Sequence, residues 1–337
     1  TNATGSFDNL EAGKYKITAT LSDGTTEKKK VEKTINIKNL DDMSAYLFVH
    51  FVDTQEDATR EQIYFSVSKD GKTWTTLNNK QPYLTSNVGT QGVRDPYILR
   101  GEDGKFFIIA TDLSVYNLKN NWTAAAQQGS KSIVVWESSD LVNWSEASLV
   151  KINNDNAGCT WAPEACYDPE KDEYMVFWAS VVSDDSYQKY RIYRSYTKDF
   201  KTFSAPELYI EEPNAVIDTT IIDHEGTYYR FTKNEAKSSI TMQECTSLSG
   251  DWKDVASYNL GSMTGYEGPT IYKLNGKNEW CLLLDYFSKS KGYKPFVTTD
   301  ITKGEFTADS DFSFDGTYRH GTVMPITQAE YESLTAE

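Results

Sequence analysis

The residues Val-Arg-Asp-Pro-Tyr-Ile at positions 93–98 have the features of the start of a buried β-strand, with an acid, Asp95, at its mouth. Proline is tolerated near the first residues of a strand, and apolar, β-favouring residues follow it. A polar turn at 101–104 then leads into a second, strongly apolar strand at 105–110. This pattern of strand, turn and strand returns along the chain, so it decides the fold.

Four further segments repeat the start of the first strand. They are Trp161-Ala-Pro-Glu-Ala-Cys, Val216-Ile-Asp-Thr-Thr-Ile, Gly265-Tyr-Glu-Gly-Pro-Thr-Ile and His320-Gly-Thr-Val-Met. A second repeated feature is a polar turn that closes on an aromatic residue, at Trp74, Trp144, Phe203, Trp252 and Phe306. We interpret the turn aspartate as a cap on backbone amides and the aromatic ring as packing between repeats. Both features indicate five units.

Five short antiparallel sheets fit the blades of a β-propeller. The last unit, from His320, has an inner strand and no partner strands after it, whereas the first unit, at 45–74, has no inner strand before it. Together they make one complete blade. We therefore predict an all-β, five-bladed β-propeller over residues 41–337, closed by N- and C-terminal strands in one blade, which leaves no unpaired edge.

Residues 1–40 differ from the rest. Alternating strands at 14–21 and 31–37, with a Ser-Asp-Gly turn at 22–24, predict a hairpin. The first of these strands resembles the closing strands of bacterial immunoglobulin-like modules. Forty residues cannot bury a core of their own. We interpret this small N-terminal β segment as part of an immunoglobulin-like domain and expect no chemistry there.

Charge and composition exclude several classes of partner. The net charge of −15 argues against nucleic acid and anionic membranes. No apolar run reaches membrane length and no signal peptide heads the chain, while the start at Thr1 favours a trimmed protein. We expect a secreted or cell-surface bacterial monomer, with a cytoplasmic location as the alternative. The four cysteines lack C-x-x-C spacing, so we predict neither zinc nor a disulfide.

All inner strands of a propeller run the same way along its channel, so their starts gather on one face. Five polar residues would therefore share one pocket: Asp95, Glu164, Asp218, Glu267 and His320. Burying several carboxylates together is costly and is tolerated mainly where their perturbed ionisation is used. Capping of a backbone amide at the start of a strand would explain a single acid of this kind. It does not readily explain why acids occur at the starts of four of the five inner strands.

The motifs Arg94-Asp95-Pro96, Trp161-Ala162-Pro163, Ile217-Asp218 and Glu267-Gly268-Pro269, followed by Arg319-His320-Gly321, resemble the propellers of glycoside hydrolase family 43. The resemblance covers residues from about 45 to 326. It implies inverting hydrolysis with Asp95 as general base, Glu267 as general acid and Asp218 as the residue that adjusts the pKa and orientation of the acid.

The resemblance also implies supporting roles. His320 resembles the channel histidine that in many members holds a calcium ion or its water shell, and a satisfied buried histidine is the alternative. No organic cofactor is expected. Three residues are candidates for contact with the sugar: Arg319, Trp161 and Glu164. The alternatives are an ion pair for Arg319, packing between blades for Trp161, and either a supporting position or a direct part in the reaction for Glu164.

The family resemblance implies release of pentoses. We predict an exo-acting enzyme that releases terminal α-L-arabinofuranosyl residues from plant polysaccharides or oligosaccharides, with β-xylosidase as the alternative. Loops at 116–129 and 183–189 are expected to set specificity, or else are plain surface loops.

Other propellers fit less well. A retaining fructan hydrolase would carry Asn-Asp-Pro-Asn-Gly, which is absent, and Glu244 falls on an outer strand. A sialidase would need an arginine cluster that the sequence does not clearly show. A non-catalytic, glycan-binding propeller is the alternative from another class.

Overall fold

The structure is a computed structural model that describes residues 13–22, 27–37, 42–52 and 57–336. The chain divides into two compact units, 1–43 and 44–337. The first unit contains the predicted hairpin, in which β1 (Gly13–Ser22) pairs antiparallel with β2 (Glu27–Ile37). Most of its predicted turn lies outside the described residues, and its immunoglobulin-like character stays a prediction.

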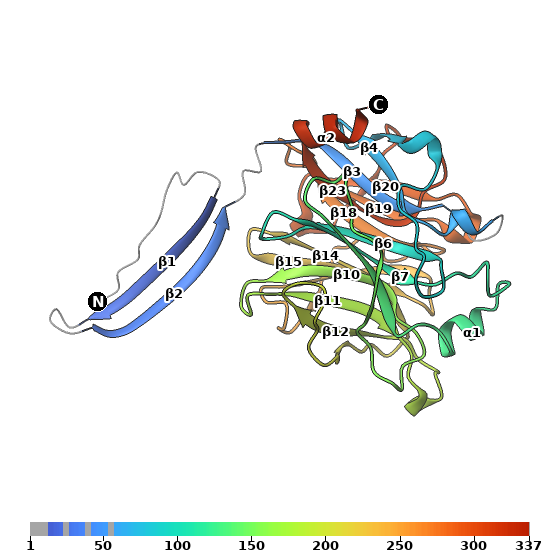
Figure 1. Ribbon diagram of the computed structural model, residues 1–337, viewed down its shortest axis with the longest axis horizontal. Coiled ribbons are helices and arrows are strands. Elements are labelled where there is room, and N and C mark those ends of the chain that lie inside the picture. The colour runs from blue at the N-terminus through green and yellow to red at the C-terminus, as the bar shows by residue number, and fades with distance from the viewer. Residues whose placement is uncertain (1–12, 23–26, 38–41, 53–56, 337) are drawn as a thin grey trace. The chain divides into compact units, whose positions relative to one another are not determined.

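The second unit is the predicted five-bladed β-propeller (Figure 1). Four blades are antiparallel sheets of four consecutive strands, with the innermost strand first. They are β6 (Val93–Arg100), β7 (Phe106–Asp112), β8 (Ser132–Ser138) and β9 (Ser148–Lys151); β10 (Trp161–Asp168), β11 (Glu173–Ser180), β12 (Arg191–Thr197) and β13 (Glu207–Ile210); β14 (Val216–His224), β15 (Thr227–Asn234), β16 (Ser239–Cys245) and β17 (Lys253–Asp254); β18 (Glu267–Lys273), β19 (Trp280–Asp285), β20 (Tyr293–Thr298) and β21 (Thr307–Ala308).

The fifth blade joins the two ends of the propeller, as predicted. Its order is β22-β5-β4-β3-β23, so the C-terminal strand β23 (Arg319–Thr327) lies innermost, beside β3 (Met43–Phe51). β4 (Tyr64–Ser68) and β5 (Thr73–Thr76) follow outward, and β22 (Ser313–Phe314) adds a parallel strand at the edge that the sequence did not indicate. The innermost strands β6, β10, β14, β18 and β23 contact one another in a closed ring.

A short helix fastens the closing blade to the first complete one. Helix α2 (Gln328–Thr335) begins with a capping box between Thr327 and Glu330. The Glu330 carboxylate also accepts hydrogen bonds from both terminal nitrogens of Arg100, at 2.7 and 2.8 Å. This bidentate ion pair links α2 to the far end of β6.

In the repeated aromatic turns, aspartates cap backbone amides, as the sequence predicts. Asp70, Asp140 and Asp199 each accept hydrogen bonds from the backbone amides two and three residues later. Trp74 and Phe306, which close two of the turns, are buried. The turns therefore stabilise the outer strands and contribute large side chains to the apolar layers between blades.

Four inner strands begin with the same irregularity. Each has a register shift within its first residues. At that point Asp95, Ala162, Asp218 and Gly268 adopt a positive φ of 50°, 47°, 50° and 49°. Positive φ is uncommon outside glycine, and a bulge turns the side chain it carries away from the regular pleat. This bulge directs the side chains of Asp95 and Asp218 toward the mouth of the channel.

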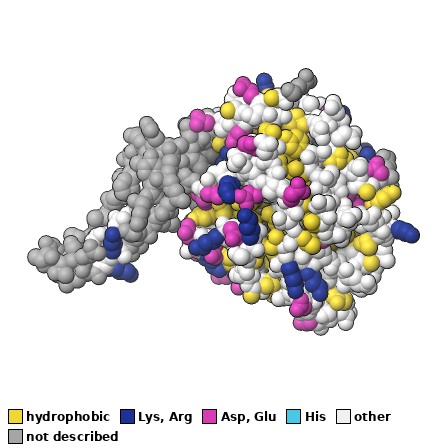
Figure 2. Space-filling model, viewed as in Figure 1, with side chains coloured by type: hydrophobic (Ala, Val, Ile, Leu, Met, Phe, Trp, Pro, Cys, Tyr) yellow, Lys and Arg dark blue, Asp and Glu magenta, His cyan; other side chains and the backbone are white. Residues whose placement is uncertain are grey.

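One face of the propeller carries charged side chains of both signs (Figure 2). On the face drawn in Figure 2, lysine and arginine side chains are scattered among acidic ones. Within the described ranges, no helix is long and apolar enough to cross a membrane.

Candidate active site

A pocket of about 550 Å³ opens where the inner strands begin. All five inner strands contribute to its wall, as predicted. The lining residues are Arg94, Asp95, Leu113, Trp122, Trp161, Ile217, Asp218, Lys233, Glu235, Glu267, Phe287, Ser290, Arg319 and His320. Residues far apart in sequence therefore meet in one site that can hold a small polar ligand.

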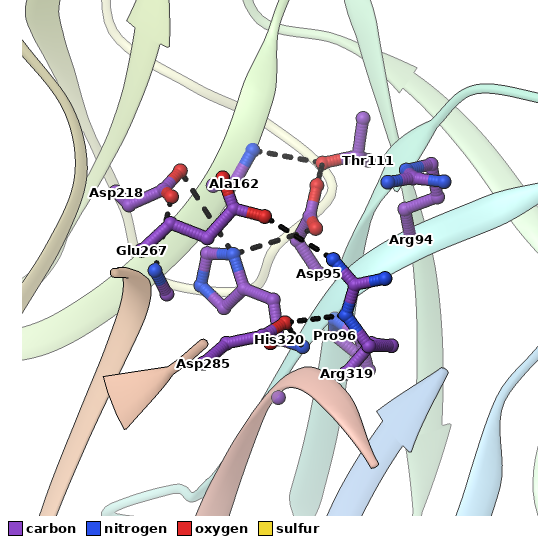
Figure 3. A network of polar contacts seen from close by, with 12 residues as sticks. Arg94, Asp95, Pro96, Thr111, Ala162, Asp218, Glu267, Asp285, Arg319 and His320 are labelled. Carbon is purple, nitrogen blue, oxygen red and sulfur yellow. Dashed lines mark hydrogen bonds and ion pairs between the residues drawn. The ribbon is translucent and has the colours of Figure 1, made fainter. Parts of the chain in front are cut away.

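Asp95 lies between Thr111 and His320 (Figure 3). Its Oδ2 accepts a hydrogen bond from the Thr111 hydroxyl at 2.9 Å, and its Oδ1 lies 3.4 Å from Nδ1 of His320. Burial acts to raise the pKa of Asp95, but the hydrogen bond and charge of His320 outweigh it, so the pKa lies below its ordinary value. Asp95 is therefore an ionised carboxylate at neutral pH and can accept a proton.

His320 lies between two carboxylates. Its Nδ1 is 3.8 Å from Oδ1 of Asp218 as well as close to Asp95. Burial alone would lower the pKa of His320, yet the Asp218 and Asp95 carboxylates raise it to about 10. The imidazole is thus a buried cation. Gly268 packs on its ring, and a Cβ there would come within 2.6 Å of His320 Cγ, so only glycine fits.

Asp218 is a buried member of the site. Its Oδ2 accepts a hydrogen bond from the backbone amide of Gly268 at 3.1 Å. Burial raises the pKa of Asp218 to about 6, with Glu267 adding to the rise while His320 and Lys233 oppose it. Asp218 is thus electrostatically linked to Glu267, and its effect on the acid stays a prediction.

Glu267 is held between two cations. Lys233 Nζ donates to its Oε2 at 2.9 Å, and Arg319 donates to its Oε1 at 3.3 Å. Lys233 also pairs with Glu235 at 2.8 Å, and its own side chain is only 4% exposed. The carboxyl group is thereby fixed at the pocket wall, with 21% of its side chain exposed.

A buried acid that the sequence analysis missed supports this arrangement. Asp285 ends β19 and is fully buried, and its Oδ2 accepts from Arg319 Nε at 2.6 Å and from the His320 amide at 3.4 Å. Burial raises the pKa of Asp285 to about 6, although the charge of Arg319 acts against this. Arg319 therefore forms the ion pair that was the alternative to sugar contact, while it also lines the pocket, and its contact with a sugar stays a prediction.

We expect Asp285→Asn to lower kcat by roughly 10²-fold, the loss that a small misplacement at a reacting group can cause. Asparagine keeps the shape but removes the charge that holds Arg319 against Glu267. The measurement is steady-state kinetics together with thermal unfolding. Asp168→Asn, a buried aspartate at the far end of β10, is the matched control. A lower melting temperature with unchanged kcat would contradict the positioning role.

Aromatic side chains form one wall. Trp161 stacks on Tyr190 with ring centroids 5.3 Å apart and meets Trp122 edge-on at 6.1 Å. Both tryptophans line the pocket, and Trp122 is 45% exposed. Trp161 therefore packs on Tyr190 of its own blade and on Trp122 of the preceding one, as the packing alternative predicts, while it also lines the pocket. Its contact with a sugar stays a prediction.

The two loops expected to set specificity differ from each other. The first contains helix α1 (Trp122–Gln127), which the sequence analysis had interpreted as part of a loop and which presents Trp122 to the pocket. The second, 183–189, contributes nothing to the lining. A segment that the sequence did not indicate, which carries Phe287 and Ser290, lines the pocket instead.

The first loop is anchored by a buried acid. Glu61 is fully buried and accepts from the amides of Val115 and Tyr116, each at 3.0 Å. It also pairs with Arg94 at 2.9 Å, and the Arg94 guanidinium lies 5.4 Å from the Trp122 ring centroid. The Arg94 of the Arg-Asp-Pro motif therefore helps to place the tryptophan wall.

Glu164 lies beneath the site. It is 4% exposed and is absent from the lining, so the arrangement gives no support to direct contact with a sugar. Burial raises the pKa of Glu164 to about 8, which keeps it protonated at neutral pH. Its Oε2 has no hydrogen-bond partner among the described residues.

The axial calcium ion stays a prediction. Calcium prefers about six to eight oxygen ligands. Among the residues that the structure describes, no group of three or more His, Cys, Asp or Glu side chains is arranged to hold a metal. His320 Nδ1 faces two carboxylates, so the donor set does not fit a direct protein cage.

Comparison with known proteins gives consistent results. Residues 41–332 match a family model described as a probable glycosyl hydrolase domain related to family 43. An α-L-arabinofuranosidase of Bifidobacterium longum subsp. longum is 30% identical over 342 residues, which cover 87% of this chain and 31% of that protein. The chain thus spans about a third of the length of this relative.

Two solved structures share the fold. The family 43 BlXynB protein of Bacillus licheniformis has a TM-score of 0.51 and 17% identity, covering 85% of this chain and 55% of that one. A family 43 β-1,3-galactosidase has a TM-score of 0.50 and 16% identity, covering 68% and 48%. At these identities the likeness concerns the fold alone.

Proposed function

Because the chain belongs to the family of probable glycosyl hydrolase domains related to glycoside hydrolase family 43, we propose that it hydrolyses terminal α-L-arabinofuranosyl linkages with inversion. The observation that carries the proposal is the convergence of Asp95, Asp218 and Glu267 on one pocket. Inverting hydrolysis needs one carboxylate to activate water and one carboxylic acid to protonate the leaving oxygen.

The proposed steps follow from the contacts. Asp95, held ionised by His320 and Thr111, takes a proton from a water molecule whose oxygen bonds to the anomeric carbon. Glu267 gives its proton to the glycosidic oxygen as the bond to the anomeric carbon breaks. Lys233 and Arg319 then stabilise the carboxylate that remains on Glu267. The proton taken from water then leaves Asp95 for solvent, and Glu267 takes up a proton from solvent, so both carboxyl groups return to their starting states before the next turnover.

The shape of the pocket supports action on chain ends or side branches. Asp218 and His320, which are both buried, line it together with Trp122 and Phe287. In this proposal, one terminal sugar reaches the buried side chains while the rest of the substrate stays outside the pocket. Since a plant polysaccharide is extracellular, we also infer a secreted or cell-surface location.

Product analysis on arabinan, arabinoxylan and xylo-oligosaccharides tests the substrate. We expect free arabinose as the only early product, because the pocket holds a terminal residue. Release of xylose alone would favour a β-xylosidase, and a ladder of oligosaccharides would contradict the exo mode. No release from any of these substrates would favour the non-catalytic, glycan-binding alternative.

Stereochemistry tests the mechanism separately. We expect proton NMR of the first-formed arabinose to show the β-anomer, followed by slow mutarotation, because Asp95 is assigned to activate water and not to attack carbon. The same spectrum recorded on an enzyme of known retaining mechanism is the control. An initial α-anomer would overturn the assignment of the two carboxylates.

A further inference from the structure

A second pocket, of about 300 Å³, lies away from the channel, between the outer strands of two neighbouring blades. It is formed by β12 and β13 on one side and by β15, β16 and the turn before β17 on the other. Its lining residues are Arg194, Tyr209, Ile210, Glu211, Glu212, Arg230, Gln243, Ser249, Gly250, Asp251 and Trp252. None of them lines the active-site pocket.

Arg230 is the unusual member of this pocket. The residue is 5% exposed, and its Nε donates to Gln243 Oε1 at 2.8 Å. The guanidinium lies 4.3 Å from the Trp252 ring centroid and 5.7 Å from that of Tyr209. Among the described residues, no carboxylate lies within ion-pair distance of it.

A buried cation without a paired anion is costly. Burial lowers the pKa of Arg230 below its ordinary value, although the Tyr209 hydroxyl and the more distant charge of Glu212 act against this. The other arginine of the pocket differs, because Arg194 Nε is paired with Glu207 at 2.8 Å and its NH1 donates to Ser249 at 3.0 Å. Arg230 is therefore the arginine of this pocket that can take an added anion.

The rim of the pocket is acidic, which limits what that anion can be. Glu211 is already paired with Lys189 and Arg191. Glu212 Oε1 lies 3.5 Å from Gln243 Nε2, and Asp251 is exposed. These carboxylates repel a small, highly charged ion such as phosphate, but they accept hydrogen bonds from hydroxyl groups.

We propose that this pocket binds an acidic sugar, a uronic acid residue. Its single carboxylate would receive a bidentate contact from the Arg230 guanidinium. Its ring hydroxyls would donate to the acidic rim formed by Glu212 and Asp251. A neutral sugar lacks the anion, and an inorganic anion lacks the hydroxyl donors. The site does not depend on the hydrolytic function, because it shares no lining residue with the active site.

Titration with galacturonic acid, followed by ¹⁵N–¹H NMR of the tryptophan indoles, tests this proposal on the whole chain. The signal of Trp252 is assigned by its loss in Trp252→Phe. We expect this signal to shift and to saturate as galacturonate is added. Galactose, which lacks the carboxylate, should bind at least roughly tenfold more weakly. The signals of Trp122 and Trp161 report the active site in the same spectrum.

Substitutions of Arg230 and a titration with acetate test whether the arginine recognises the carboxylate of the sugar. Arg230→Gln should abolish the shift, and Arg230→Lys should weaken it, because lysine keeps the charge but loses the planar fork. The wild-type titration decides the matter even if neither variant folds. No shift at Trp252, an equal shift with galactose, or an equal shift with acetate would each overturn the proposal. Because the readout is binding, failure of hydrolysis would leave it unaffected.

Discussion

Asp95→Asn is expected to lower kcat/KM by roughly 10²–10⁴-fold on every substrate, the range that general base catalysis supplies. The amide cannot take a proton from water, and activation of water is needed whatever the leaving group. Aryl arabinofuranosides and natural oligosaccharides should therefore lose activity to a similar extent. The measurement is kcat/KM on both classes of substrate.

The backbone at Asp95 permits a clean substitution. Its φ of 50° is a conformation that asparagine tolerates as well as aspartate. Asp172, with a φ of 57° in the turn between β10 and β11, offers a matched control, since Asp172→Asn makes the same chemical change at a similar backbone angle. Activity retained in Asp95→Asn, or lost equally in Asp172→Asn, would contradict the assignment of the base.

The fold could be predicted because its signals are local and repeated. Each inner strand begins with a polar or aromatic motif, and the aromatic turns at Asp70, Asp140, Asp199 and Asp300 each carry an aspartate cap. Counting these features gives the number of blades. The unmatched first and last units then predict the closure between β3 and β23.

The supporting residues of the site escaped the sequence analysis for a geometric reason. In an antiparallel pair, the end of the second strand lies beside the start of the first. Thr111 is thus paired with Arg94, Lys233 with Ile217, and Asp285 with Glu267. A search of strand ends as well as strand starts would have found all three.

Other features could not be predicted from the sequence. Glu61 reaches Arg94 and the first loop only through tertiary packing, and no local pattern marks it. Glu164 follows Trp-Ala-Pro as the resemblance requires, yet it lies two residues beyond the left-handed Ala162 and is buried beneath the site. Because of the bulge, a shift of one or two positions decides whether an acid faces the pocket or the interior.

Glu267→Gln is expected to lower kcat/KM on natural oligosaccharides by roughly 10²–10⁴-fold. A dinitrophenyl arabinofuranoside should be affected far less, because its phenolate departs without a proton. The contrast between the two substrates separates loss of an acid from loss of binding, which would weaken both alike. It also distinguishes this variant from Asp95→Asn, for which the two losses should be similar.

A matched control exists on the outer surface of the propeller. Glu137 also lies between two cations, Lys105 and Lys201, and its side chain is 25% exposed against 21% for Glu267. Glu137→Gln therefore removes a carboxylate from a similar electrostatic setting without touching the pocket, and it should leave both substrates unaffected. If Glu267→Gln lost equal activity on both, Glu267 would be a binding residue held by Lys233 and Arg319, and the proton donor would have to be sought elsewhere in the pocket. If only the substrate with the poor leaving group suffered, the two cations would be acting on the proton donor itself, stabilising the carboxylate that each turnover produces.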